Sequence, residues 1–265
     1  MNKSNLVKYG IVALVIVTLF YLVYLNTKIS SLQKTVGGLA TTGTGTTPTA
    51  AQPQAAPTVS LDQVKNVLNK AFIKFGNDSS KVVALEISDP SCPYCQIAGG
   101  KNSALNDQSA QFKLVADGGT YVSPVQEIKK LVDAGKASFA LIYFPGHGSG
   151  EMGMKALYCA FEAGKFWQAN DLIMSAAGYD LMNNTVHNDK TQSGVVANFL
   201  ASVVDKNTMK TCLDSGKYDS QLTADQALAQ GLNIQGTPGF YINATNFAGA
   251  YSYTQMEPVV TAALK

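Results

Sequence analysis

The chain has 265 residues, a formal net charge of +2 and 46% apolar residues, which excludes an intrinsically disordered polymer. All 20 basic residues are lysine, so sequence-specific DNA binding, which relies largely on arginine, is not expected and no nucleic-acid partner is predicted. Four cysteines are too few for a disulfide-built miniprotein.

An apolar run occupies residues 9–25 and follows Lys3 and Lys8. It is at the short end for a membrane-spanning helix, and tyrosines lie near both of its ends, as in an aromatic belt. A cleaved signal peptide and a buried core helix are the alternatives, but no A-x-A cleavage site follows the run directly. We expect an uncleaved N-terminal transmembrane anchor within residues 1–28.

Residues 29–59 are predicted to form a flexible linker. The stretch 37–59 is rich in Thr, Ala, Pro and Gly and contains no charged residue. Such a composition cannot bury enough apolar surface to fold by itself. A folded domain is therefore expected over residues 60–265.

The first half of this domain alternates between helices and strands. Ser60 and Gln63 form a capping-box pattern that begins a helix, which Gly76 and Asn77 are expected to end. Apolar, β-branched runs predict strands, and Pro93 fits the first position of a helix. The segments predicted to follow the first helix are a strand over 81–88, a helix from 93, a helix over 126–134 and a strand over 138–144.

The second half has mostly helical spacing over 151–231, where Thr223 and Gln226 form another capping-box pattern. Further predictions are a strand over 240–243, a possible hairpin partner over 247–251, and a last helix capped by Thr254 and Glu257. This order is typical of an α/β core interrupted by a helical insertion.

The motif Cys92-Pro93-Tyr94-Cys95 carries the sharpest chemical signal. It follows a predicted strand and begins a predicted helix, where free backbone N–H groups and the helix dipole stabilise a thiolate. We expect the pKa of Cys92 to be lowered and Cys92 to be the more exposed, attacking cysteine. Cys95, one turn further, would resolve the mixed disulfide. A purely structural disulfide is the alternative.

A zinc site is not expected, because zinc needs two further ligands beside the motif. The remaining candidates are not paired at short spacing: Cys159, Cys212, His147 and His187. Both histidines are interpreted as ordinary loop residues.

Several segments resemble the DsbA-like thiol–disulfide oxidoreductases of the thioredoxin superfamily. Residues 85–95 are similar to the active-site segment, and residues 236–242 to the cis-proline loop with its following strand. Residues 159–167 and 212–218 resemble parts of the family's helical insertion. The resemblance extends from residue 81 to the C-terminus. It implies a thioredoxin-like fold with an inserted helical domain over about 148–231.

The resemblance assigns supporting roles to three further residues. Thr237 and Pro238 match the loop that faces the active cysteines, where a cis bond exposes backbone groups to an extended peptide. An ordinary trans turn proline is the alternative. Glu86, six residues before Cys92, could relay a proton to or from Cys95 if it is buried. A solvent-exposed glutamate at a strand end is the alternative.

Cys159 and Cys212 form the second cysteine pair. Within the insertion they could join two helices by a structural disulfide, and two independent buried thiols are the alternative. Both cysteine pairs suit an oxidising compartment. This favours an N-terminus inside the cell and a domain on the periplasmic or extracellular side.

The sequence departs from the family in two places. Position 94 is Tyr where strongly oxidising DsbA enzymes have His, so a stabiliser of the Cys92 thiolate is missing. The segment Gly99 to Pro124 is longer and more polar than expected, and it is a candidate for a loop or subdomain that shapes the substrate groove.

These features predict a membrane-tethered thiol–disulfide oxidoreductase that acts on cysteines of secreted or envelope proteins. It would need no cofactor, because the Cys92–Cys95 pair is the redox group. A quinone-linked membrane oxidase or an electron donor would reset it. Oxidase, isomerase and reductase directions stay open. The alternative is a tethered chaperone or binding module with a non-catalytic CxxC motif.

Overall fold

The computed structural model describes residues 58–77 and 79–265. The predicted anchor over 1–28 and nearly all of the predicted linker lie outside the described residues. No helix in the described part is long and apolar enough to cross a membrane.

A five-stranded mixed sheet forms the centre of the described chain, with the strand order β1-β3-β2-β4-β5. The two central strands, β2 and β3, run parallel, and every other neighbouring pair is antiparallel. This sheet confirms the predicted α/β class. The strands are β1 (Ile73–Phe75), β2 (Val82–Ser88), β3 (Ala137–Tyr143), β4 (Gly239–Ile242) and β5 (Thr245–Ala248).

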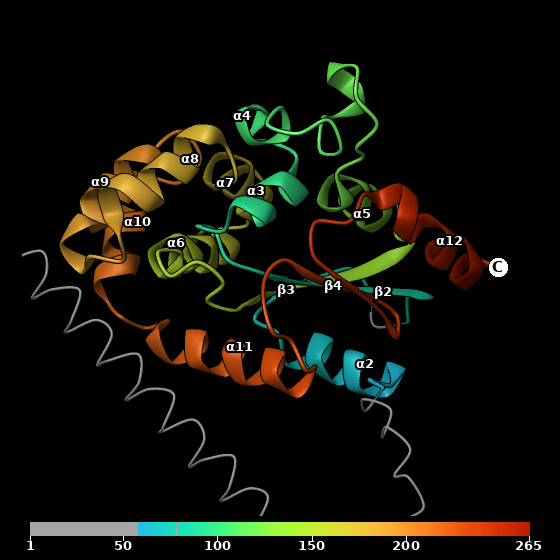
Figure 1. Cartoon of the computed structure of the whole chain (residues 1–265). Coiled ribbons are helices and arrows are strands. Elements are labelled where there is room, and N and C mark those ends of the chain that lie inside the picture. Colours follow the sequence, from blue (N-terminus) through green and yellow to red (C-terminus); the bar gives the residue numbers. More distant parts are fainter. Residues whose placement is uncertain (1–57, 78) are drawn as a thin grey trace, which may run out of the picture. The chain divides into compact units, whose positions relative to one another are not determined.

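Helices account for most of the remaining residues (Figure 1). They are α2 (Leu61–Lys70), α3 (Pro93–Gly99), α4 (Ser103–Asn106), α5 (Pro124–Asp133), α6 (Glu151–Glu162), α7 (Phe166–Ile173), α8 (Ala176–Asp180), α9 (Ser193–Phe199), α10 (Lys206–Asp214), α11 (Asp219–Gly231) and α12 (Tyr253–Leu264). Short 3-10 or π turns occur at η2 (Val115–Asp117), η3 (Leu181–Val186) and η4 (Lys190–Gln192).

The sheet carries a separate hydrophobic core on each face. Helices α2 and α11 cover one face, and α3, α5 and α12 cover the other (Figure 1). Along β2, Leu85 and Ile87 belong to the core under α2 and α11, whereas Ala84 belongs to the core under α3. Because side chains alternate along a strand, Glu86 and Ser88 also face α3.

The helices α6 to α10 pack beside the sheet and fall within residues 148–231, the range predicted for a helical insertion (Figure 1). The last helix of the predicted range, α11, instead covers a face of the sheet. Asp225 on α11 accepts hydrogen bonds from the backbone N–H of Tyr143 at 2.9 Å and from the Tyr158 hydroxyl at 2.7 Å. This buried carboxyl therefore connects α11, the end of β3 and α6.

The first predicted helix ends earlier than expected. It stops at Lys70, and Ala71 is already extended, with ψ of 140°. Residues 73–75 then pair with β3, so that Ile73 lies opposite Leu141. Strand pairing with a distant segment overrides the local helical pattern, and the sequence prediction missed β1 for that reason.

Three boundaries in the second half also differ from prediction. Helix α11 begins at Asp219, so Thr223 is an interior residue and does not cap it. Helix α12 is capped by a box of Ser252 and Gln255, not by Thr254 and Glu257. Strand β5 begins at Thr245, since a tight turn with Asn243 at φ 52° follows β4 directly.

Candidate active site

The CxxC motif lies at the start of α3, immediately after the loop that follows β2. Cys92 is the N-cap residue and Pro93 occupies the first turn. Both cysteines are free thiols, and both are buried, with Cys92 5% exposed and Cys95 fully covered. Tyr94, at 52% exposed, is the member of the motif that faces solvent.

The two thiols differ sharply in acidity. A hydrogen bond from Cys95 is the main cause that lowers the pKa of Cys92 to about 6, and Thr237 and the N–H groups of Cys95 and Tyr94 add to it against the opposing effect of burial. Burial raises the pKa of Cys95 well above its ordinary value, and the neighbouring Cys92 raises it further. At neutral pH Cys92 is therefore the thiolate and Cys95 the thiol.

The loop before β4 lies directly against Cys92. The Thr237–Pro238 peptide bond is cis, so the alternative of a trans turn proline is wrong. Cys92 Sγ lies 3.4 Å from the carbonyl oxygen of Thr237, to which the protonated thiol can donate a hydrogen bond. Gly146 packs so closely here that a Cβ on it would overlap the Thr237 side chain. The sequence-predicted loop and the CxxC motif are thus brought together.

Glu86 is buried beneath the motif, at 4% exposed, so the alternative of a solvent-exposed glutamate is wrong. Burial raises its pKa to about 7, with the Ser88 hydroxyl acting in the opposite direction. The same hydroxyl also lowers the pKa of Cys95. Ser88 is therefore a neighbour of both the Glu86 carboxyl and the resolving thiol of Cys95.

Sequence reasoning missed Ser88 as a site residue. The available signal was its position two residues after Glu86, which places both side chains on the same face of a strand. Nothing in the sequence alone indicated that this face would be the one covered by α3.

Asp89 is a second buried residue that sequence reasoning missed. Its carboxylate accepts hydrogen bonds from the N–H and hydroxyl of Ser91 at 2.8 and 2.7 Å. It also accepts from the N–H groups of His147 at 2.8 Å and Gly148 at 3.4 Å. Asp89 thus connects the loop after β3, through His147 and Gly148, to Ser91 next to Cys92.

His147 lies in this exposed loop, in agreement with its interpretation as a loop residue. One ring nitrogen, Nδ1, is 3.2 Å from the side-chain oxygen of Asn183. The Asn183 amide in turn donates to the carbonyl oxygen of Ser91 at 3.1 Å. His187 follows η3 with φ of 44°. The loop 145–149 and η3 therefore border the CxxC motif.

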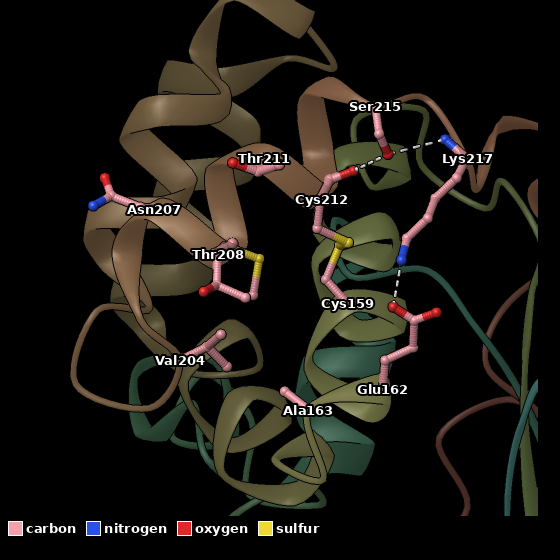
Figure 2. A pocket seen from close by; sticks show the side chains of 11 residues that line it. Cys159, Glu162, Ala163, Val204, Asn207, Thr208, Thr211, Cys212, Ser215 and Lys217 are labelled. Atoms are coloured by element: carbon pink, nitrogen blue, oxygen red, sulfur yellow. Dashed lines mark hydrogen bonds and ion pairs between the residues drawn. A yellow bond between two sulfur atoms is a disulfide. The ribbon is translucent and has the colours of Figure 1, made fainter.

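Cys159 and Cys212 are joined by a disulfide, with an S–S distance of 2.01 Å. It links α6 to α10, whose residues 159 and 212 are 53 apart in sequence. Figure 2 shows this disulfide at a cavity of about 660 Å³, with Lys217 reaching across to Glu162. None of the residues that line this cavity belongs to the CxxC motif or the cis-proline loop.

This cavity of about 660 Å³ is therefore separate from the CxxC motif and the cis-proline loop. A smaller cavity of about 380 Å³ is lined by Thr237 and Pro238, beside Cys92. The acid–base pattern and the cis-proline loop make this second region the candidate active site. Among residues 58–77 and 79–265, no cluster of three or more potential metal ligands occurs.

Residues 122–262, just over half of the chain, match the family model described as Thioredoxin. The chain therefore belongs to the thioredoxin family. The CxxC motif lies before the matched range, so its assignment rests on the geometry above. No curated protein sequence matches the chain.

Several solved structures share this fold, among them proteins named BdbD, ScsC and DsbA1. Oxidised BdbD from Bacillus subtilis is 19% identical, with a TM-score of 0.53 over 72% of this chain and 91% of that one. The catalytic domain of Proteus mirabilis ScsC is 20% identical, with a TM-score of 0.52 over 78% and 99%. Wolbachia pipientis alpha-DsbA1 is 17% identical, with a TM-score of 0.53 over 72% and 89%. The thioredoxin-like fold and the resemblance to DsbA-like proteins expected from the sequence are confirmed.

Proposed function

We propose that this chain is a membrane-anchored thiol–disulfide oxidoreductase whose folded domain works on the periplasmic or extracellular side. The observation that carries the proposal is the difference between the two thiols of the CxxC motif. Cys92 has a pKa lowered to about 6 and lies against the cis Thr237–Pro238 bond, whereas Cys95 is fully buried with a raised pKa. A nucleophile and a resolving thiol need these two different environments.

Exchange starts from the Cys92–Cys95 disulfide when the enzyme acts as an oxidant. A substrate thiolate attacks Cys92 Sγ, a mixed disulfide forms, and the bond between Cys92 and Cys95 breaks. Cys95 leaves as a thiolate and takes up a proton. A second substrate thiolate then attacks the substrate sulfur of the mixed disulfide and releases Cys92 as a thiolate. Two electrons have passed from the substrate to the CxxC pair, and the same steps in reverse describe a reductant.

Glu86 supplies the proton for Cys95 in this scheme. Its raised pKa of about 7 keeps a large fraction protonated at neutral pH, which suits a general acid that must also be reprotonated. Ser88 is buried and influences the pKa of both groups, so in this scheme the proton passes through its hydroxyl. The CxxC pair needs no additional redox group.

The disulfide between Cys159 and Cys212 supports the proposed side of the membrane, since structural disulfides persist in oxidising compartments. The partners proposed are cysteine-containing secreted or envelope proteins and a membrane redox protein that resets the CxxC pair. The anchor within residues 1–28 would hold the enzyme near both.

The test is a pair of substitutions in cells that express the full chain. Cys95→Ala should accumulate mixed disulfides between Cys92 and secreted proteins, visible as thiol-sensitive adducts on non-reducing gels. Cys95→Ala combined with Cys92→Ser should form none. A tethered chaperone or binding module with an inert CxxC motif would trap no adduct in either variant, and that result would reject the enzyme.

The reduction potential of the Cys92–Cys95 pair would then identify the direction. A value near about −120 mV marks an oxidant, and one near about −270 mV marks a reductant. Equilibration with glutathione buffers of stated ratio, followed by thiol labelling, measures it directly.

A further inference from the structure

The segment between α3 and α5 forms a small subdomain whose hydrophobic cluster also includes Ile97 of α3. Ile97, Leu105 and Tyr121 are buried together, and Phe112 and Leu114 pack against them. This is the stretch, Gly99 to Pro124, by which the chain departs from its family pattern. Its backbone is closed by hydrogen bonds between residues 113–115 and Tyr121.

Aromatic rings from this subdomain continue outward from the CxxC motif. The exposed Tyr94 ring lies edge-on to Phe112 at a centroid distance of 6.0 Å, and Phe112 lies edge-on to Tyr121 at 5.8 Å. The Tyr121 hydroxyl donates to the carbonyl oxygen of Tyr251 at 3.3 Å. A row of rings thus runs from the dipeptide between the two cysteines to the segment after β5.

Two rings of this row, Phe112 and Tyr121, line a cavity that adjoins the cis-proline loop. The cavity has a volume of about 500 Å³, and Phe112, Tyr121 and Tyr251 are among its lining residues. It shares Ala248 and Gly249 with the cavity of about 380 Å³ at Thr237 and Pro238. A polypeptide bound beside Cys92 at the cis-proline loop would therefore extend directly into the ring-lined cavity.

The lining of both cavities contains no Lys, Asp, Glu or His side chain. The polar side-chain groups around the ring-lined cavity are neutral: they come from Gln111, Ser252 and Gln255 and from the hydroxyls of Tyr121 and Tyr251. A charged side chain would lose hydration there without gaining an opposite charge. An aromatic or large aliphatic side chain would bury apolar area against the rings.

We propose that this subdomain is a specificity element that selects extended polypeptides with an aromatic or large apolar residue near the reacting cysteine. The proposal rests on the thiol–disulfide exchange proposed above and names the substrate class of that site.

The experiment uses the oxidised full chain in lipid nanodiscs and ten-residue peptides with a single cysteine. The peptides differ at one position near the cysteine, which carries Phe, Tyr, Leu, Gly, Asp or Lys, and that position is moved to either side of the cysteine. Acid quenching and mass spectrometry give the rate at which the mixed disulfide with Cys92 forms. We expect the best-placed Phe peptide to react about tenfold faster than the Gly peptide, and the Asp and Lys peptides no faster than Gly.

Two variants test the ring-lined cavity itself. Phe112→Ala and Tyr251→Ala should each lose most of the preference for Phe, measured as the ratio of the Phe-peptide rate to the Gly-peptide rate in the same variant. Phe112→Leu should keep part of the preference. Val115→Ser is the matched control, since Val115 is 57% exposed on the same subdomain and does not line the cavity. Because the Tyr251 side chain is 40% exposed, its removal tests the proposal even if Phe112→Ala fails to fold.

The outcomes separate the two proposals. Equal rates for the Phe and Gly peptides, or a preference that survives both cavity variants, would overturn the specificity element and leave the exchange activity standing. No reaction with any peptide or with a reduced protein would reject the enzyme as well.

Discussion

The two cysteine pairs of this chain can form the same kind of bond, a disulfide, but we assign them different roles. We interpret one pair as redox-active and the other as a structural crosslink. Cys92 and Cys95 are separated by two residues at a helix N-terminus, whereas Cys159 and Cys212 join two helices across 53 residues. Closing a loop of four residues restricts the unfolded chain by about 2 kcal/mol, and closing one of 53 by about 4 kcal/mol. The short loop therefore leaves its disulfide easier to open, and the long loop makes its disulfide a stabilising crosslink.

The electrostatic surroundings reinforce this difference. The CxxC pair has the buried Glu86 beneath it and a cis-proline loop against its nucleophile. The second pair has near it the exposed ion pair between Glu162 and Lys217, which provides no buried proton donor. A comparison of matched variants at the two pairs can therefore separate chemistry from stability.

Cys92→Ser should show the largest effect. Removal of the attacking sulfur should lower the rate of disulfide exchange with a reduced protein by at least about 10³-fold. The midpoint of urea unfolding, compared with that of the reduced wild type, should change little. An exchange rate within tenfold of wild type would show that Cys92 is not the attacking cysteine, and our assignment of the chemistry to the CxxC pair would be wrong.

Removing the second pair should give the reverse pattern. Cys159→Ala together with Cys212→Ala should lower the free energy of unfolding by about 4 kcal/mol, measured by urea titration under non-reducing conditions. The rate of exchange at Cys92, measured at a temperature where the variant is folded, should stay close to wild type. Full loss of exchange in a folded variant would mean that the second pair takes part in the chemistry.

Glu86→Gln should change how stability depends on pH. The folded-state pKa of Glu86 is raised to about 7. The contribution of protonated Glu86 to the free energy of unfolding is therefore fully present below about pH 4.5 and is lost as the pH rises through about 7. For the oxidised proteins, wild type should therefore lose about 3 kcal/mol relative to Glu86→Gln between pH 4.5 and pH 8.5.

Glu162→Gln is the control for this measurement. Its carboxyl is exposed, and the hydrogen bond from Lys217 lowers its pKa, so the substitution should have little influence on stability over the same pH range. Urea titrations of both variants at the two pH values make the comparison. Parallel pH profiles for Glu86→Gln and wild type would show that Glu86 is not a buried titrating group.

Tyr94→His should give the smallest effect, and it refines the contrast between the two thiols of the CxxC pair. Wild-type Cys92 should lose its reactivity with iodoacetamide as the pH falls through about 6, where its thiolate is protonated. An imidazolium at position 94 should stabilise the thiolate further. We expect the midpoint to fall by about one pH unit and the potential of the pair to rise by about 30 mV. A midpoint that rises would contradict this account.

The sequence predicted what depends on local pattern and on family resemblance. Strong hydrophobic periodicity, or a residue that starts or ends an element, marks three segments in the sequence. They are the strand before Cys92, the helix that begins at Pro93 and the helical block after Glu151. The contact between Thr237 and Cys92 joins residues 145 apart and was expected only from the family resemblance.

The missed features depend on contacts that local pattern does not encode. The three residues of β1 form a strand because β3 provides partners, and Asp89 matters because a loop some sixty residues away supplies its donors. The row of rings from Tyr94 through Phe112 to Tyr121 follows from how the 99–124 segment folds back. Spacing in the sequence gave no sign of it.

The buried carboxylate of Asp89 also has a kinetic consequence. The amide hydrogens of His147 and Gly148 belong to an exposed loop, yet both point at an acceptor that solvent does not reach. Their exchange with deuterium requires this loop to lift from Asp89, and such openings occur at a free energy below that of global unfolding. The deuterium-exchange rates of these two amides therefore report how often this loop opens next to the CxxC motif. A substrate bound across the loop and the motif would lower both rates.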